Sequence, residues 1–315
     1  MISEPDAIRQ ILKDSNFSVH TYNFAEIADR VGAKFLHQRI LPAYLPVAID
    51  GTDHMKLRRR FEQEISTNAS RALALFESYL AEAIPVLFEG STPSRFCIVH
   101  DLLKPSIRSA NLAIAGIETC TADDLESLPL FFDKSLSLKK RRYIEQLIDD
   151  LYSSLPHAMA ADEKYFRIAM LALNMNTVLG STTESFLTVV RRNAGILLKD
   201  MDWDSELPAT GLPMVERRAL ANSIICGKAI RAGDRVQLFL DVAGFDEDRG
   251  PRYSELYFAV GGHKCPGMNY SRRLWNILTR RMKTLQKRLR ILAIEYRSND
   301  SVFNILQKLE VELHA

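Results

Sequence analysis

The sequence predicts a mainly α-helical fold with a small β region, organised as a single domain over residues 1–315. Three observations lead to this prediction. Apolar residues recur at helical spacing as far as Asp200, and beyond it short alternating runs with turn signals take over. No repeat, low-complexity segment or linker divides the chain, and a hydrophobic content of 47% is enough for one large core.

The predicted helices follow one another through the first part of the chain. An apolar stripe at helical spacing predicts a helix over residues 55–90. Three more helices are expected over 101–120, 122–136 and 139–155, each bounded by Pro, Gly or an Asp, Ser or Thr start. The longest candidate covers 162–193 and has an apolar middle and charged ends, so we expect it to run through the centre of the protein.

The region after Asp200 is different in character. Residues 223–244 alternate and carry turn signals at Cys226-Gly227 and at 232–234, which predicts short strands. A glycine-rich loop, FAVGGHKCPG, occupies 258–267. Residues 268–292 follow it and are expected to form an amphipathic basic helix.

Composition excludes several classes of function. A net charge of +2 provides no field that would favour nucleic acid or a membrane surface, and no apolar run reaches the roughly 20 residues of a membrane span. The N-terminus lacks the apolar region of a signal peptide. The four cysteines form no CxxC pair and suggest neither a zinc site nor a disulfide framework. We therefore expect a soluble cytoplasmic protein that binds no nucleic acid and no membrane.

The glycine-rich loop presents an isolated thiol, that of Cys265. A helix is predicted to begin near Met268, and the N–H groups at such a helix start stabilise a thiolate. His263 and Lys264 add hydrogen-bond donors or positive charge beside it. The local chemistry allows three interpretations: a thiolate that ligates a metal, a nucleophile, or a structural thiol in an incidental glycine turn.

The spacing of the loop residues resembles that of a known family. Phe258-x-x-Gly261-x-His263-x-Cys265-x-Gly267 resembles the haem-binding loop of the cytochrome P450 family, in its soluble bacterial form. The resemblance implies haem b (iron protoporphyrin IX) with the Cys265 thiolate as the proximal iron ligand. It also implies that the glycines let the backbone approach the porphyrin and donate N–H groups to the sulfur.

Other segments resemble the same family in the same order, so the resemblance covers nearly the whole chain. DGTDHMKLRRRF (50–61) is similar to the family's helix in which a His and an Arg, here His54 and Arg58, bind the haem propionates. The strand region beginning at ERRALANS places Arg217, in preference to Arg218, at a further propionate-binding position, and His263 of the loop is a fourth such group.

The long central helix carries a further resemblance. LGSTTESF (179–186) is similar to the family's oxygen-binding groove, with Gly180 at the kink and Thr183 as the hydroxyl near dioxygen. Thr182 replaces the acid that usually precedes this threonine, and it is the second catalytic candidate.

The chain also departs from the family pattern. It begins at the helix that normally follows an N-terminal helix and sheet, so we expect a P450-like fold truncated at the N-terminus. The family's Glu-x-x-Arg pair is missing, because no arginine lies between Lys199 and Arg217. Asp204 or Glu206 stands near the place of the glutamate. In the family this ion pair braces the loop that holds the cysteine.

The resemblance implies a haem-thiolate monooxygenase. Such an enzyme oxidises a small organic substrate, here expected in secondary metabolism, with dioxygen and electrons from a ferredoxin or flavodoxin. A basic run after the ligand is a candidate docking face for that donor: Arg272, Arg273, Arg280, Arg281 and Lys283. The alternatives are a peroxide-using, rearranging or dehydrating haem enzyme, or a non-catalytic partner or scaffold protein. A homodimer that covers the truncated front is a further expectation.

Overall fold

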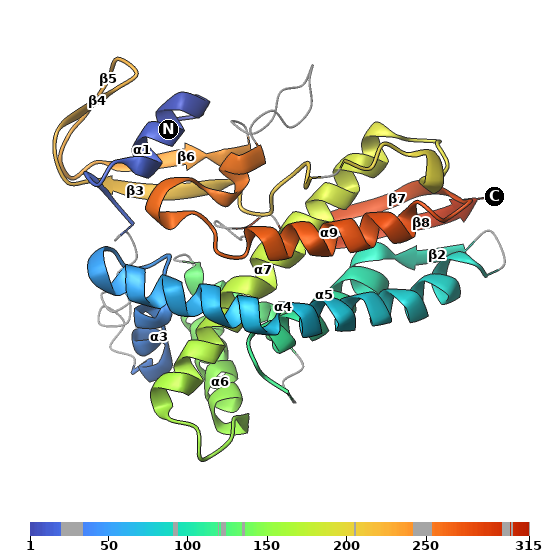
Figure 1. Ribbon diagram of the computed structural model, residues 1–315, viewed down its shortest axis with the longest axis horizontal. Coiled ribbons are helices and arrows are strands. Elements are labelled where there is room, and N and C mark those ends of the chain that lie inside the picture. The colour runs from blue at the N-terminus through green and yellow to red at the C-terminus, as the bar shows by residue number, and fades with distance from the viewer. Residues whose placement is uncertain are drawn as a thin grey trace.

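The computed structural model of the chain is shown in Figure 1. It describes residues 1–19, 34–90, 94–118, 120, 124–133, 136–204, 206–241, 254–297, 303 and 305–314. The N-terminal helix α1 (Pro5–Lys13) and the C-terminal strands lie at opposite ends of the long axis (Figure 1).

Long helices form the body of the molecule, as the sequence predicts. The helix α7 (Ala161–Arg192) runs through the centre and contacts α5 (Lys104–Ile114), α6 (Leu138–Ser154) and α9 (Met268–Met282). The 38-residue α4 (Gly51–Phe88) packs against α5 and lies beside α9 (Figure 1). The buried faces of these helices join into one apolar core.

Two of the predicted helices have a different backbone from the one expected. Within the stretch 122–136, the described residues form a 3₁₀ helix, η3 (Leu125–Phe132), because Pro129 inside it has no N–H to donate and disfavours an α-helix. The stretch 101–120 begins as a π-helix, η2 (Ile98–Leu103), and α5 then starts with a proline in its first turn.

An antiparallel sheet near the N-terminus contains β1 (Phe17–Ser18), β3 (Met214–Ala219) and β6 (Arg235–Phe239), with β3 in the middle. A separate hairpin joins β4 (Ser223–Ile225) to β5 (Lys228–Ile230) through a turn in which Cys226 and Gly227 have positive φ. These strands confirm the β region predicted after Asp200. Together with α1 they enclose a second, smaller apolar cluster.

The C-terminal part of the chain differs from the prediction. The basic helix expected over 268–292 ends at Met282, and Arg288 begins the strand β7 (Arg288–Tyr296). This strand pairs with β8 (Leu306–His314), which also pairs with β2 (Ser94–Cys97). The cause is tertiary, because pairing with β8 satisfies the backbone of a segment whose basic residues also fit a helix.

The remaining short elements connect these parts. They are α3 (Leu36–Ile40), η1 (Leu41–Tyr44), η4 (Leu198–Asp200), η5 (Ser254–Phe258) and η6 (Gly261–His263). Within the described ranges, none of the helices combines the length and the apolar character that a membrane crossing requires.

Candidate functional site

The cysteine loop joins η5 to α9 and is closed by its own backbone. The N–H of Cys265 donates to the carbonyl oxygen of Phe258 at 2.7 Å, and the N–H of Lys264 donates to that of Gly261 at 3.2 Å. Gly261 has φ +76°, and a Cβ there would lie 2.6 Å from the carbonyl oxygen of Leu12. Only glycine fits at this position, where the loop meets the end of α1.

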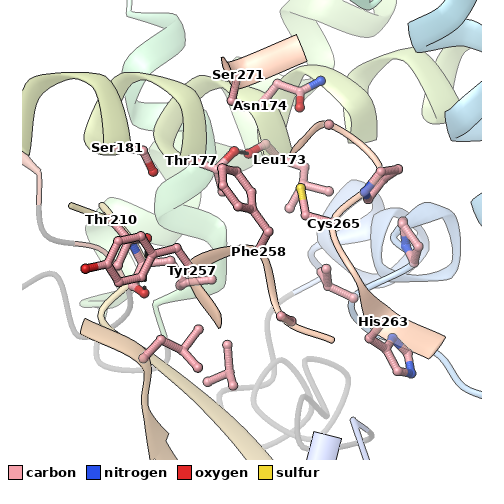
Figure 2. A pocket seen from close by; sticks show the side chains of 18 of the residues that line it. Leu173, Asn174, Thr177, Ser181, Thr210, Tyr257, Phe258, His263, Cys265 and Ser271 are labelled. Carbon is pink, nitrogen blue, oxygen red and sulfur yellow. Dashed lines mark hydrogen bonds between the residues drawn. The ribbon is translucent and has the colours of Figure 1, made fainter. Parts of the chain in front are cut away.

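The thiol of Cys265 is enclosed and receives backbone hydrogen bonds. Burial raises its pKa, whereas the N–H groups of Gly267 and Met268 and the charge of Arg58 act in the opposite direction. The start of α9 therefore offers N–H donors to the sulfur, as the sequence predicts. Figure 2 shows the sulfur on the side of the loop that faces α7. A sulfur in this setting is prepared to carry negative charge when a cation binds it.

The sulfur lies in the wall of a cavity between the loop, α4, α7 and β3. The cavity contains about 1380 Å³ of space, counted out to its open mouth. Most of its wall is apolar, including Phe61, Ile65, Phe132, Leu173, Val178, Leu240, Phe258 and Phe303. The polarity of this wall suits a mainly apolar molecule.

Two histidines from distant parts of the chain meet at the rim of this cavity. The rings of His54 and His263 are 3.9 Å apart between centroids. The Nε2 of His263 lies 3.0 Å from Oδ1 of Asp50. Burial, together with the electrostatic influence of the neighbouring His54 and Arg217, lowers the pKa of His263 to about 4, although Asp50 acts in the opposite direction. His263 is therefore a neutral hydrogen-bonding group at neutral pH.

Two arginines line the same cavity. Arg58 donates from Nη1 to the carbonyl oxygen of Gly262 at 3.1 Å. Arg217 is 7% exposed, whereas its neighbour Arg218 lies on the exposed face of β3. Successive residues of a strand point to opposite faces, so only one of the two can reach the cavity. The structure places Arg217 there, in agreement with the choice made from the sequence.

One face of α7 lines the cavity. The residues on it are Leu173, Asn174, Thr177, Val178 and Ser181. Thr182 and Thr183 are buried outside this lining, and the hydroxyl of Thr183 donates to the carbonyl oxygen of Gly180 at 3.1 Å. Because each helical residue turns by about 100°, Thr183 lies about 200° around the helix from Ser181. The structure therefore does not bring Thr182 and Thr183 into the lining of this cavity, and their catalytic roles stay a prediction.

Thr177 and Ser181 are the hydroxyl-bearing residues of α7 that line the cavity. Figure 2 shows both side chains leaving α7 toward the cavity. The hydroxyl of Thr177 donates to the carbonyl oxygen of Leu173 at 2.7 Å, and the hydroxyl oxygen of Ser181 accepts from the N–H of Gly211 at 3.2 Å. The sequence did contain a signal for these residues. Leu173, Thr177 and Ser181 are spaced four residues apart, so they share one face of the helix.

Gly180 is the place where the segment before β3 packs against α7. A Cβ on Gly211 would lie 2.6 Å from the Cα of Gly180, so the segment before β3 runs directly against α7. Ser185 reinforces this contact by donating to the carbonyl oxygen of Ala209 at 3.1 Å. Gly180 is absent from the lining of the cavity among the residues that the structure describes.

Comparison with known proteins identifies the fold. No family model and no curated protein sequence matches the chain. Solved structures do match it over 98–99% of its length. CalO2 aligns with a TM-score of 0.79 at 15% identity, over 90% of its own chain. P450BioI, in complex with an acyl carrier protein ligated to hexadec-9Z-enoic acid, gives 0.72 at 16% over 92%. P450 StaH from glycopeptide antibiotic A47934 biosynthesis gives 0.67 at 18% over 90%.

The chain has the cytochrome P450 fold. Identities of 15–18% establish the fold and carry no statement about substrate. In this fold α7 is the long central helix, and the loop around Cys265 joins η5 to α9.

The residues of the cavity fit a haem. The thiol of Cys265 is of the ligand type that P450 iron takes, and it already has N–H donors. His54, Arg58, Arg217 and His263 bring four donor groups to the rim, where Asp50 is the acid bonded to His263. Such a set matches two carboxylates on an apolar ring system. This P450 fold therefore retains the chemical groups that a haem requires.

Proposed function

We propose that the protein is a haem-thiolate monooxygenase that holds haem b. One observation carries the proposal. A single apolar cavity brings the enclosed thiol of Cys265, four cationic or hydrogen-bonding side chains and a hydroxyl-bearing face of α7 together. The P450 fold agrees with this assignment and does not establish it.

Each group has a proposed role toward the cofactor. Cys265 would ligate the iron, and its N–H donors on Gly267 and Met268 would moderate the charge on the sulfur. His54, Arg58, Arg217 and His263 would hold the propionates, and Phe258 would line the ring. When bound, a thiolate-ligated haem supplies the oxidative chemistry, which takes one atom of dioxygen into a substrate and the other into water, with two electrons and two protons.

The protein's own contribution to proton supply lies on α7. Thr177 donates to a backbone carbonyl, so its oxygen can accept a hydrogen bond from the cavity. Ser181 accepts from Gly211, so its O–H proton remains for a donor bond. We assign these two hydroxyls, one helical turn apart, the task of holding and passing protons in the cavity.

The wall indicates the kind of substrate. Aromatic and branched apolar side chains form most of it, which suits a small, mainly apolar organic molecule. P450 StaH takes part in antibiotic biosynthesis, and we extend the same setting, secondary metabolism, to this protein as part of the proposal.

An electron donor would bind at the groove between α4 and α9. Arg273 and Arg280 line it together with Glu77, which pairs with Arg280 at 2.9 Å. Of the basic run predicted as a docking face, Arg272 and Arg281 are also engaged in ion pairs, and Arg273 is exposed. An acidic ferredoxin or flavodoxin is the proposed donor. The rate at which this donor reduces the protein should fall as the salt concentration increases.

The visible spectrum tests the function directly. The purified protein, reduced and treated with carbon monoxide, should show the long-wavelength Soret band of a thiolate-ligated haem. Cys265→Ser should abolish that band, and Cys226→Ser, an exposed cysteine on the β4–β5 turn, should leave it unchanged. A wild-type protein that remains colourless after addition of hemin would refute the proposal.

One observation favours a second candidate function. Among the described residues, none of those through which α7 lines the cavity is titratable, so this lining contains no acid from α7 to support proton delivery. A peroxide-using enzyme has less need of such an acid, because peroxide brings its own protons. Turnover with hydrogen peroxide, and none with a reductase and ferredoxin, would select this second function.

A further inference from the structure

The segment that should contain the Glu-x-x-Arg pair holds a different ion pair. Residues 200–216 include no lysine or arginine, so a carboxylate there needs a cation from elsewhere. For Glu206 this cation is Arg272 of α9, whose Nη2 donates to Oε2 of Glu206 at 2.8 Å. The same oxygen accepts from the hydroxyl of Ser254, at the start of η5, at 2.9 Å.

These contacts reach both flanks of the cysteine loop. Ser254 opens the helix that leads into the loop, and Arg272 lies on the helix that leaves it. Two further bonds connect the same flanks to the same segment. The indole N–H of Trp275 donates to the carbonyl oxygen of Asp204 at 3.0 Å, and the hydroxyl of Tyr257 donates to that of Pro208 at 3.3 Å.

A short path leads from the ion pair to the sulfur. The guanidinium carbon of Arg272 lies 5.7 Å from the centre of the Phe258 ring. The carbonyl oxygen of Phe258 in turn accepts the N–H of Cys265. Arg272 therefore contacts the residue that fixes the backbone of the ligand cysteine.

The loop needs such support. Ala259 has φ +54°, a conformation that a residue with a Cβ adopts only when its surroundings enforce it. Ala259 lies between Phe258 and Gly261, which are held by Arg272 on one side and by the end of α1 on the other. Release of either hold allows the loop to relax.

We propose that Glu206 and Arg272 are a positioning pair that holds the Cys265 loop in its ligating form, in place of the absent Glu-x-x-Arg pair. The pair bonds α9 and η5 to Glu206 and so closes the base of the loop. The inference rests on the proposed function only in taking Cys265 as the haem ligand.

The test compares two ion pairs on the same segment. Arg272→Met removes the proposed pair. Arg192→Met removes the bond of Arg192 to Asp204, which is 3.3 Å long, similarly exposed, and joined to α7 instead of a flank of the loop. Iodoacetamide alkylation of the full-length protein without haem, followed by peptide mass spectrometry, gives the rate at Cys265 relative to exposed Cys226.

We expect the relative alkylation rate of Cys265 to rise about tenfold in Arg272→Met, the effect of one lost charge-assisted hydrogen bond on a two-state loop. Arg192→Met should leave it within about twofold. With haem bound, the thiolate-type carbon monoxide band should weaken in Arg272→Met alone. Equal alkylation in the two variants, or no change in either, overturns the proposal.

Exchanging the two charges of the pair distinguishes loss of the ion pair from a general loss of stability. Glu206→Arg combined with Arg272→Glu should return the alkylation rate toward that of the wild type, because the opposite charges still meet. Failure of the exchange together with failure of Arg272→Lys to rescue would count against the pair. If the wild-type protein takes up no haem, the proposed function fails, yet the alkylation comparison still decides whether the pair positions the loop.

Discussion

Replacing Gly261 by alanine isolates the contact between the cysteine loop and α1. Gly261 has φ +76°, and its new Cβ would lie 2.6 Å from the carbonyl oxygen of Leu12 and 3.2 Å from the Cα of Lys13. These are backbone atoms of a helix whose apolar face is buried, so they cannot move aside as a flexible side chain can.

Two costs add up at this position. A left-handed backbone costs a residue with a Cβ about 1–2 kcal/mol, and the overlap with backbone atoms costs about 1–3 kcal/mol. Gly261→Ala should therefore weaken the native arrangement by about 2–5 kcal/mol. The neighbouring Gly262 is a matched control, because a Cβ there meets nothing within 4 Å and its φ is outside the left-handed range.

Urea unfolding of the full chain, followed by circular dichroism, measures the global part of the loss. Hemin titration measures the local part, in which the loop leaves α1 while the rest stays folded. Gly262→Ala should change either quantity by less than about 0.5 kcal/mol. If the two alanine variants behave alike in both measurements, the proposed contact between the loop and α1 is wrong.

Three further predictions follow from the site. Thr177→Ala should reduce turnover of a small aromatic substrate with a ferredoxin system by about 10²-fold. Thr183→Ala removes a hydroxyl that bonds a helix carbonyl, so it should cost about 1 kcal/mol of stability and little turnover. Equal losses of turnover in the two variants would contradict the assignment of proton transfer to Thr177. The pKa of His263 is lowered from 6.5 to about 4, so the unfolded chain takes up a proton at a higher pH than the folded protein does. The free energy of unfolding should therefore fall by on the order of 2–3 kcal/mol as pH drops from about 6.5 to 4. In urea unfolding, His263→Asn should lose this dependence on pH, and an unchanged dependence would argue against the role of His263. Gly211→Ala should destabilise the fold by about 1–3 kcal/mol in thermal unfolding because its Cβ would overlap the α7 backbone, while Gly90→Ala, with only an ordinary contact at 3.7 Å, should be nearly neutral; the reverse order would count against the close packing of α7.

The helices could be predicted from the sequence because their signals are local. The apolar stripe of α4 and the long apolar middle of α7 are properties of a few consecutive turns, and both helices lie where they were expected. The end of α9 was not predictable in this way. Arg288–Tyr296 becomes a strand because it pairs with β8, a separate segment of the chain, and not because of a signal in its own sequence.

At the functional site, the same distinction between local sequence signals and tertiary packing applies to single residues. The motif around Cys265 and the spacing of His54 and Arg58 led to side chains that do line one cavity. The motif on α7 led to Thr183, which the structure does not place in the lining of that cavity, so its role stays a prediction. The single domain and the homodimer stay predictions.

What the amino-acid order alone determined is the set of local features: where most helices run, which loop carries the thiol, and which strand arginine points inward. The helices follow from a period of 3.6 residues and the loop from its glycines, which act between near neighbours, whereas the arginine was chosen from the resemblance to the cytochrome P450 strand region. Tertiary structure decided which face of α7 lines the cavity and which cation forms the ion pair with Glu206. Both depend on how segments far apart in sequence pack together, and local periodicity contains no information about that packing.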